Sequence, residues 1–190
     1  MPSRPPRQPP AISDAVLEKS ALFYLERFAA SSAQLRRVLL RRVKRAEMLG
    51  TGKPEAEAAR RHIETLIARF LASGLLDDRR FAEAQAASLQ RRGASRRRIR
   101  ERLASKGLDR EIVDAALETV DEPAGELAAA CALVRRRRLG PYRAAGARAA
   151  HRQKDLAALA RAGFSLDMAR KVLAAGNPEA LERLLRDSET

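Results

Sequence analysis

The side chains that most often perform covalent or acid–base chemistry are few and scattered in this sequence. It contains two histidines, His62 and His151, and one cysteine, Cys131. They lie too far apart in sequence for the short spacings of a metal site or of a nucleophile with its base. Cys131 shares a helical face with Leu127 and Val134, which indicates a small buried hydrophobic residue rather than a reactive thiol. We therefore expect a noncatalytic protein without a metal or a cofactor.

A glycine-containing stretch at 50–54, GTGKP, resembles part of a phosphate-binding loop. In the pattern GxxxxGK[ST], a Ser or Thr after the Lys binds magnesium, but Pro54 stands at that position here. The first Gly of the pattern is also missing, because Glu47 occupies its place. These departures argue against a nucleotide site.

The acidic residues of 107–131 form no evident acid–base pair either, and we interpret them as residues on solvated helix faces.

Positive charge is the strongest chemical signal in the chain. There are 38 Lys and Arg residues against 24 Asp and Glu, a formal net charge of +14. The stretch 34–47 carries six basic residues and one acid, 91–106 carries eight and one, and 135–154 carries eight and none. Between the last two lies 107–131, with seven acids and one Arg. If surface charge served only solubility, basic and acidic residues would be interspersed. Their separation here favours a surface that binds a polyanion or an acidic protein.

The second basic stretch indicates which arginines are directed outward. When Ile99 and Leu103 are placed toward the core and the helix advances about 100° per residue, Arg97, Arg98 and Arg100 point away from it. Arg96 and Arg102 flank the apolar stripe. The candidate binding residues are Arg36, Arg37 and Arg41 in the first stretch, Arg97, Arg98 and Arg100 in the second, and Arg135, Arg136 and Arg137 in the third.

Reading of DNA sequence by a helix-turn-helix is not favoured. Such a motif places the helix that follows its turn in the major groove. Here the helix after Gly107 is the acidic DREIVDAALETVDE, which phosphates would repel, and the basic helices precede the turns. This order favours contact with a nucleic-acid backbone or a protein surface.

The elements that position these residues are predicted to be helices. Aromatic residues make up 4% of the chain and Trp is absent, and an Ala- and Leu-rich core suits helices better than strands. Three corners share one pattern, a Gly followed by Leu or Phe and a nearby Asp or Ser that can cap the next helix: SGLLDDRRFAEA at 73–84, KGLDREIVDAAL at 106–117 and AGFSLDMARKVL at 162–173. We expect an all-α, elongated tandem array of three three-helix repeats that is monomeric.

The predicted organisation has five parts. They are a disordered Pro/Arg-rich tail (1–13), the three repeats (14–76, 77–121 and 122–176), and a short C-terminal helix with its tail (177–190). In the first repeat, Leu17, Ala21, Leu25 and Phe28 are expected on one apolar stripe. Ser31 and Gln34 stand at the spacing of a capping box at the start of the next helix.

Three segments together resemble the RecX family, regulators of the RecA recombinase. They are ALFYLERFAASSAQLRRVLLRR, LASGLLDDRRFAEAQAASLQRRGASRRRIRERLASKGLDREIVDAAL and RQKDLAALARAGFSLDMARKVL, and the resemblance covers about residues 17–175. Its most specific part is GLLDDRRFA followed by the Arg-rich Gly stretch and the KGL corner. The third repeat departs from the family pattern in the Ala-rich YRAAGARAAH.

The resemblance implies a noncatalytic, helical protein that binds in the groove of a RecA filament on single-stranded DNA. It would oppose filament extension, ATP hydrolysis, strand exchange and co-protease activity of the SOS response. Two other interpretations stay open: a nonspecific architectural or regulatory protein that binds duplex DNA, if only weakly, and a helical scaffold whose charge confers solubility. No apolar run approaches the ~18 residues of a membrane span, and with a single Cys we expect a cytoplasmic protein without a membrane partner.

Overall fold

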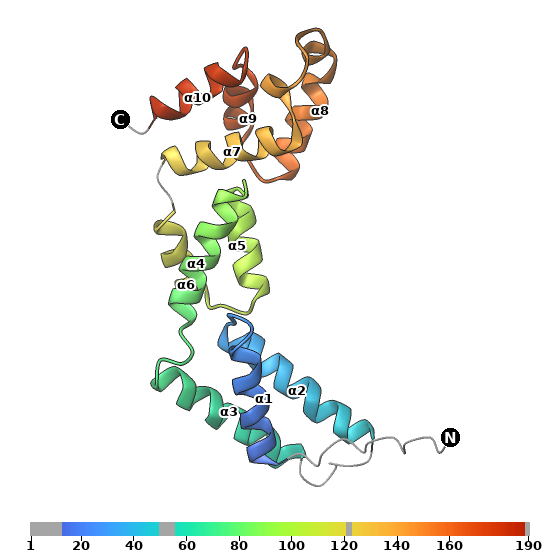
Figure 1. Ribbon diagram of the computed structural model, residues 1–190, viewed down its shortest axis with the longest axis vertical. Helices are drawn as coiled ribbons and strands as arrows, with labels where there is room; N and C mark the ends of the chain where they lie inside the picture. Colours follow the sequence, from blue (N-terminus) through green and yellow to red (C-terminus); the bar gives the residue numbers. More distant parts are fainter. Residues whose placement is uncertain (1–12, 50–55, 121–122, 189–190) are drawn as a thin grey trace, which may run out of the picture. The chain divides into compact units, whose positions relative to one another are not determined.

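The computed structural model describes residues 13–49, 56–120 and 123–188, which form ten α-helices, two 3-10 turns and no strand (Figure 1). This confirms the all-α prediction. None of the helices in these ranges is long and apolar enough to cross a membrane. The proline-rich tail, apart from Ser13, and the GTGKP stretch lie outside the described residues.

The described residues up to Phe81 form one compact unit and those from Ala82 onward a second, here called unit 1 and unit 2. Three α-helices lie within each of the predicted ranges 14–76, 77–121 and 122–176, and one lies within 177–190. Unit 2 contains the third of these ranges and most of the second. The division into three repeats and the elongated shape stay predictions.

Unit 1 contains α1 (Asp14–Leu25), α2 (Ser32–Met48) and α3 (Ala56–Ala72) (Figure 1). Their apolar faces meet in one core that buries Leu17, Leu35, Leu39, Ile63 and Leu66. The predicted capping box begins α2: the Ser31 hydroxyl accepts from the Gln34 amide, and the Gln34 side chain accepts from the Ser31 amide. The basic side of α2 therefore lies opposite a fixed core face.

The prediction for Phe28 was wrong. Helix α1 ends at Leu25, so the helical spacing that would have placed Phe28 on the apolar stripe does not continue that far. Phe28 is 56% exposed, and its ring packs on the Tyr24 ring with the centroids 5.2 Å apart. Helical periodicity predicts a buried position only within the helix itself.

Most of the remaining helices belong to unit 2, and α4 begins just before the boundary. They are α4 (Asp78–Arg91), α5 (Arg96–Ser105), α6 (Arg110–Glu118), α7 (Pro123–Arg137), α8 (Arg148–Arg161), α9 (Leu166–Leu173) and α10 (Pro178–Arg186), with 3-10 turns at Gly140–Tyr142 and Ala145–Ala147. One core joins α7 to α10 and includes Cys131. Burial raises the pKa of the Cys131 thiol to about 11, which keeps it protonated at neutral pH.

The three glycine corners have the predicted backbone geometry, but not all of the predicted caps. Gly74, Gly107 and Gly163 have φ values of 74°, 79° and 92°, in the left-handed region that favours glycine after a helix. Ser165 then caps α9 by accepting from the Met168 amide at 3.1 Å. Asp109, in contrast, makes no side-chain capping bond at the start of α6. The turn at Gly107 thus depends on backbone geometry more than on the cap.

Candidate functional site

The Arg-rich helix α5 presents its arginines as the sequence predicts. Ile99 and Leu103 are buried, whereas the side chains of Arg97 and Arg98 are 75% and 65% exposed. Arg100 is also exposed. Guanidinium groups at such positions can donate several hydrogen bonds to phosphate or carboxylate without disturbing the core.

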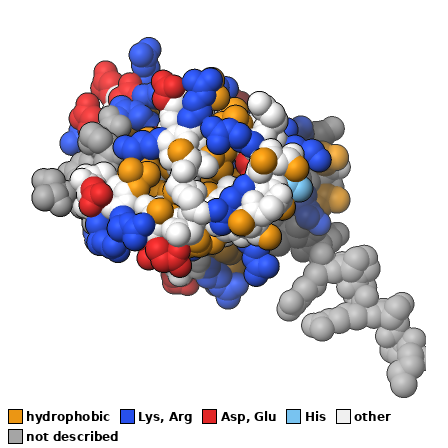
Figure 2. All heavy atoms as spheres, turned by 90° about the horizontal axis from the view of Figure 1, so that it is seen from above, with side chains coloured by type: hydrophobic (Ala, Val, Ile, Leu, Met, Phe, Trp, Pro, Cys, Tyr) orange, Lys and Arg blue, Asp and Glu red, His pale blue; other side chains and the backbone are white. Residues whose placement is uncertain are grey.

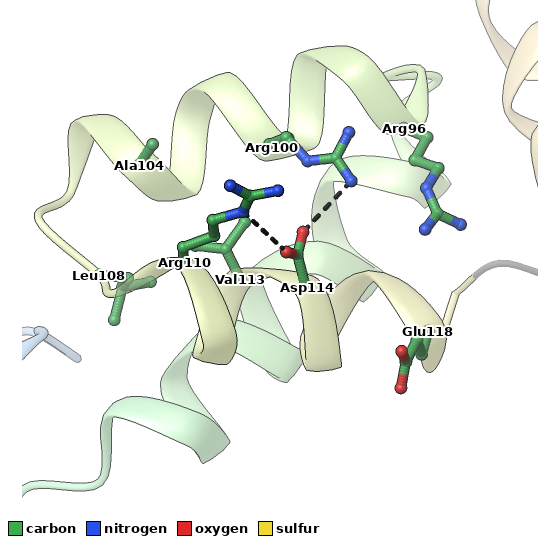
Figure 3. A pocket seen from close by; sticks show the side chains of 8 residues that line it. All are labelled: Arg96, Arg100, Ala104, Leu108, Arg110, Val113, Asp114 and Glu118. Carbon is green, nitrogen blue, oxygen red and sulfur yellow. Dashed lines mark hydrogen bonds and ion pairs between the residues drawn. The ribbon is translucent and has the colours of Figure 1, made fainter.

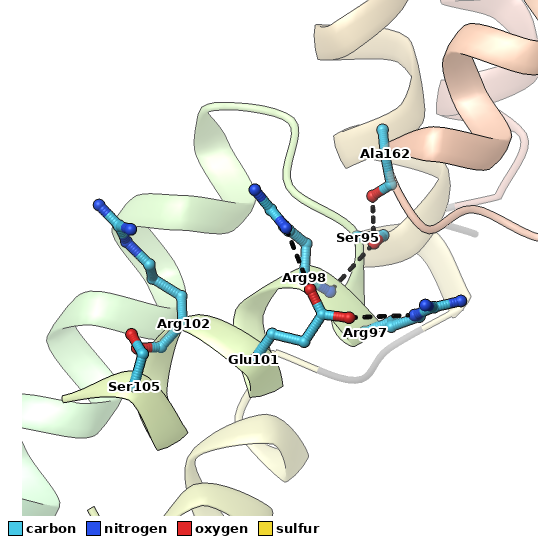
Figure 4. A network of polar contacts seen from close by, with 7 residues as sticks. All are labelled: Ser95, Arg97, Arg98, Glu101, Arg102, Ser105 and Ala162. Carbon is cyan, nitrogen blue, oxygen red and sulfur yellow. Dashed lines mark hydrogen bonds and ion pairs between the residues drawn. The ribbon is translucent and has the colours of Figure 1, made fainter. Parts of the chain in front are cut away.

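One acid lies among these arginines. Glu101 accepts from Arg97 Nε at 3.2 Å and from Arg98 Nη1 at 3.1 Å (Figure 4). These bonds, the one from Arg97 first, lower the pKa of Glu101. Ion pairs that face water contribute little to stability, so an anionic partner could replace Glu101 at small cost. We name the exposed face formed by Arg97 and Arg98 the α5 surface.

Arg100 is directed instead across to α6. Its Nη2 lies 3.2 Å from Asp114 Oδ1, and Arg110 Nε lies 3.4 Å from Asp114 Oδ2 (Figure 3). The three side chains lie along a groove of about 660 Å³ between α5 and α6, whose apolar side includes Leu108 and Val113. A carboxylate therefore already occupies the position between the two guanidinium groups.

The third basic stretch adjoins the second. Arg135, Arg136 and Arg137 are exposed at the end of α7. Arg136 Nη1 donates to the carbonyl oxygen of Arg92 at 2.6 Å, which links this helix end to the loop before α5. The structure thus brings two of the three predicted clusters together, and it gives Arg136 a contact within unit 2.

The loop before α5 is held by residues that the sequence analysis did not select. The Ser95 hydroxyl accepts from the Arg98 amide at 3.2 Å and donates to the carbonyl oxygen of Ala162 at 2.7 Å (Figure 4). Glu126 accepts from the Arg96 amide at 3.0 Å. Burial raises the pKa of Glu126, and the bond from the Arg96 amide opposes the rise. A Ser directly before RRRIR is a capping signal that could have been recognised, whereas its partner Ala162, directly after α8, could not be inferred from the sequence.

Gly93 in the same loop was also missed. It has a φ of 80°, and a Cβ at this position would lie 2.7 Å from the Leu133 amide nitrogen and 2.9 Å from the Ala129 carbonyl oxygen of α7. Glycine therefore allows the loop to approach the α7 backbone closely. This contact helps to fix the start of α5 in unit 2.

The first basic stretch lies on α2 in unit 1. Arg36 forms a bidentate pair with Glu64 of α3, with Nη2 2.7 Å from Oε2. Arg37 Nε donates to the carbonyl oxygen of Ala33, and Arg41 lines a groove between α1 and α2. The three candidates in this stretch thus have different surroundings.

The positive charge is not one uniform patch. On the face shown in Figure 2, Lys and Arg side chains are spread around exposed hydrophobic side chains, and Asp and Glu gather in fewer places. His62 and His151 belong to different units: His62 Nδ1 lies 3.1 Å from Asp14 Oδ2 on α1, and His151 Nδ1 lies 2.9 Å from the Ala147 carbonyl oxygen. The exposed Lys and Arg side chains can therefore bind anions.

The chain is similar to a family model and to two proteins that bear a name. The family model described as "RecX, second three-helix domain" matches residues 77–117, which contain α4, α5 and α6. The protein named Regulatory protein RecX from Myxococcus xanthus (strain DK1622) is 42% identical over 171 residues, which cover 90% of each chain. The protein of the same name from Agrobacterium fabrum (strain C58 / ATCC 33970) is 33% identical over 169 residues, 89% of this chain and 87% of that one.

The fold is also similar to that of a solved structure. The chain matches a crystal structure of regulatory protein RecX with a TM-score of 0.57 and 20% identity, over 85% of this chain and 71% of that one. At this identity the likeness concerns the fold alone. The two relatives, which match over nearly the whole chain, show that this protein belongs to the RecX family of regulatory proteins.

Proposed function

We propose that the chain is a noncatalytic regulator that binds RecA filaments on single-stranded DNA. Binding would inhibit filament extension, ATP hydrolysis, strand exchange and co-protease activity. The names of the relatives support a regulatory role, and the resemblance to the RecX family suggests RecA as the target. The observation that carries the proposal is the α5 surface, where Arg97 and Arg98 project from a helix that is fixed by its buried face.

This surface suits a charged polymer better than a small ligand. Arg97 and Arg98 share a single carboxylate, Glu101, so their charge is only partly neutralised inside the protein. The end of α7, with Arg135 and Arg137, adds exposed positive charge beside the loop that leads into α5. Several weak contacts on one rigid body can together give strong binding, because the later contacts form without a further loss of translational freedom.

The experiment measures inhibition of ATP hydrolysis by preformed RecA filaments. The variant Arg97→Gln with Arg98→Gln removes two exposed charges without adding an acid beside Glu101. We expect the concentration for half-inhibition to rise at least tenfold, equivalent to about 1.4 kcal/mol of lost binding free energy. The same loss is expected in direct binding to filaments assembled on single-stranded DNA.

The matched control is Arg61→Gln with Arg183→Gln. Both of these arginines are exposed and lie outside the three basic stretches, so the net charge falls by the same amount. Circular dichroism should show equal helicity for both double variants. A folded Arg97→Gln, Arg98→Gln variant that inhibits as well as the parent protein removes the α5 surface from the proposed site.

Direct binding to duplex DNA is the second candidate, because the same guanidinium groups fit phosphates of any nucleic acid. A salt series distinguishes the two, since binding through phosphates weakens steeply as salt rises. We expect tighter binding to RecA-coated DNA than to bare single-stranded or duplex DNA at physiological salt. Equal binding to bare duplex and to the filament would favour the duplex-binding protein.

A further inference from the structure

A second basic surface, different in character from the α5 surface, lies in unit 1. A groove of about 720 Å³ runs between α1 and α2, which are neighbours in this unit (Figure 1). Its apolar side includes Val16, Phe23 and Val38. The Phe23 side chain is 53% exposed, although it lies on a helix whose other face is part of the core. A partner that covered this ring would gain the free energy of removing apolar area from water.

The charge around the groove has one sign. Lys19, Arg41, Arg42 and Arg45 line it, and the described residues of its lining include no Asp or Glu. Within the described ranges, Arg41, Arg42 and Arg45 form no ion pair, whereas Arg36 on the same helix pairs with Glu64. Arg41 and Arg45 are four residues apart, which places them on one edge of α2. The groove therefore presents an apolar floor beside a row of cations.

We propose that this groove, which we call the α1–α2 groove, binds an acidic amphipathic helix of a partner protein. A helix with apolar residues at i, i+3, i+4 and i+7 can lay them along a groove between two helices. Acidic residues beside that stripe would then lie next to Arg41 and Arg45. Both properties of the groove, its apolar floor and its unmixed positive charge, match this occupant.

Single-stranded nucleic acid fits the groove less well. Base binding without sequence preference depends on stacking against exposed aromatic faces. The Arg27 guanidinium already lies over the Phe23 ring, 4.0 Å from its centroid, and the Tyr24 ring packs against Phe28. The Phe23 and Tyr24 rings are thus partly engaged by their own neighbours, although Phe23 is still 53% exposed and can be covered by aliphatic side chains. The occupant lies on unit 1 and needs no nucleic acid, so this proposal is independent of the filament contact at the α5 surface.

The test uses a fluorescent synthetic peptide of Leu, Ala and Glu, roughly 15 residues long so that it can form a helix. In the probe peptide the Leu residues fall on one helical face; in the control peptide the same residues are shuffled so that they do not. Anisotropy with the full-length protein should show binding of the probe and at least tenfold weaker binding of the shuffled peptide.

The variant Arg41→Glu with Arg45→Glu should weaken probe binding at least tenfold, because it places negative charge along one side of the groove. The control Arg61→Glu lies on α3 and does not line the groove. It should bind the probe as the parent protein does.

A tryptophan reporter locates the peptide without relying on lost affinity. The chain has no Trp, so Phe23→Trp places a single indole at the edge of the groove and replaces a side chain that is already half exposed. We expect its emission to shift to shorter wavelength when the probe binds and to stay unchanged with the shuffled peptide. The proposal is overturned if the shuffled peptide binds equally, if Arg41→Glu with Arg45→Glu leaves binding unchanged, or if oligothymidylate shifts the emission and the probe does not.

Discussion

Ser95 Oγ donates a hydrogen bond to the carbonyl oxygen of Ala162, 2.7 Å away. The same hydroxyl accepts from the Arg98 amide and is fully buried, so one side chain caps α5 and ties it to the end of α8. Arg97, the first arginine of the α5 surface, follows Ser95 by two residues. Their direction in space therefore depends on a contact between two helical groups of unit 2.

Replacing Ser95 by Ala should lower the free energy of unfolding of unit 2. The variant loses the helix cap, worth about 1 kcal/mol, and leaves the Ala162 carbonyl without this donor, which costs about 1–3 kcal/mol when a group is buried. Urea unfolding followed by circular dichroism measures the change. We expect a loss of about 2–4 kcal/mol in total.

Ser165→Ala is the matched control for this prediction. Ser165 caps α9 through the Met168 amide but is exposed. It should cost only about 1 kcal/mol, the usual value of a cap. Equal losses for the two variants would mean that the bond to Ala162 adds nothing to stability.

Gly93→Ala should also destabilise unit 2. The added Cβ would come within 2.7 Å of the Leu133 amide nitrogen, and the φ of 80° disfavours any residue with a Cβ. Left-handed backbone alone costs about 1–2 kcal/mol, and the contact with the α7 backbone adds to it. We expect a fall in the midpoint of thermal unfolding, together with weaker inhibition by the α5 surface.

Gly146→Ala provides the comparison. A Cβ at Gly146 meets no atom within 4 Å, and its φ lies outside the left-handed region. This substitution should leave the midpoint unchanged or raise it slightly, because Ala restricts the unfolded chain more than Gly does. A Gly93→Ala protein as stable as Gly146→Ala would contradict the close approach.

Patterns within one helix could be predicted from the sequence. The placement of Ile99 and Leu103 toward the core and of Arg97 and Arg98 toward solvent follows from a 3.6-residue period, and the structure agrees. The capping box at Ser31 could also be predicted, because it depends only on the residue types within four consecutive positions. Such features need no knowledge of what packs against the helix.

Relations between helices could not be predicted in this way. Arg100 was expected to be available for binding, yet it reaches Asp114, fourteen positions along the chain on another helix. Gly93 was not recognised as a contact point, because its partner α7 is known only after the chain has folded. Phe28 shows the limit of periodicity itself, since the helix ends before reaching it.

Asp155 is predicted to make the stability of unit 2 dependent on pH. It is only 2% exposed and accepts from Arg143 Nε at 2.8 Å, from Arg143 Nη2 at 2.7 Å and from the Gly140 amide at 2.9 Å. Burial raises the pKa of Asp155, but these bonds outweigh it and hold the pKa below its usual value. Asp155→Asn should cost about 1.5–3 kcal/mol at neutral pH, the usual value of hydrogen bonds to a charged group.

The sign of the pH effect follows from the lowered pKa. In the unfolded chain Asp155 takes up a proton near pH 3.9, whereas in the folded protein it does so at lower pH. Its contribution is therefore complete above the unfolded pKa and is lost as the pH falls through the folded pKa. Urea unfolding at neutral and acidic pH should show the parent protein and Asp155→Asn converging in acid, and a constant difference would contradict the assignment.

Asp114→Asn should increase the affinity of the α5–α6 groove for anions. Asp114 lies between Arg100 and Arg110, so its carboxylate offsets part of their positive charge and competes with any phosphate. The amide removes this competition, and because these pairs are at least partly exposed each is worth only about 0.2–1 kcal/mol. We expect oligothymidylate to bind a few times more tightly at low salt, with little change in stability.

Asp167→Asn is the control, since it raises the net charge equally and removes only the 3.8 Å pair with Arg170. A similar gain in both variants would assign the effect to net charge, whereas a gain confined to Asp114→Asn would mean that this carboxylate occupies an anion-binding position between α5 and α6.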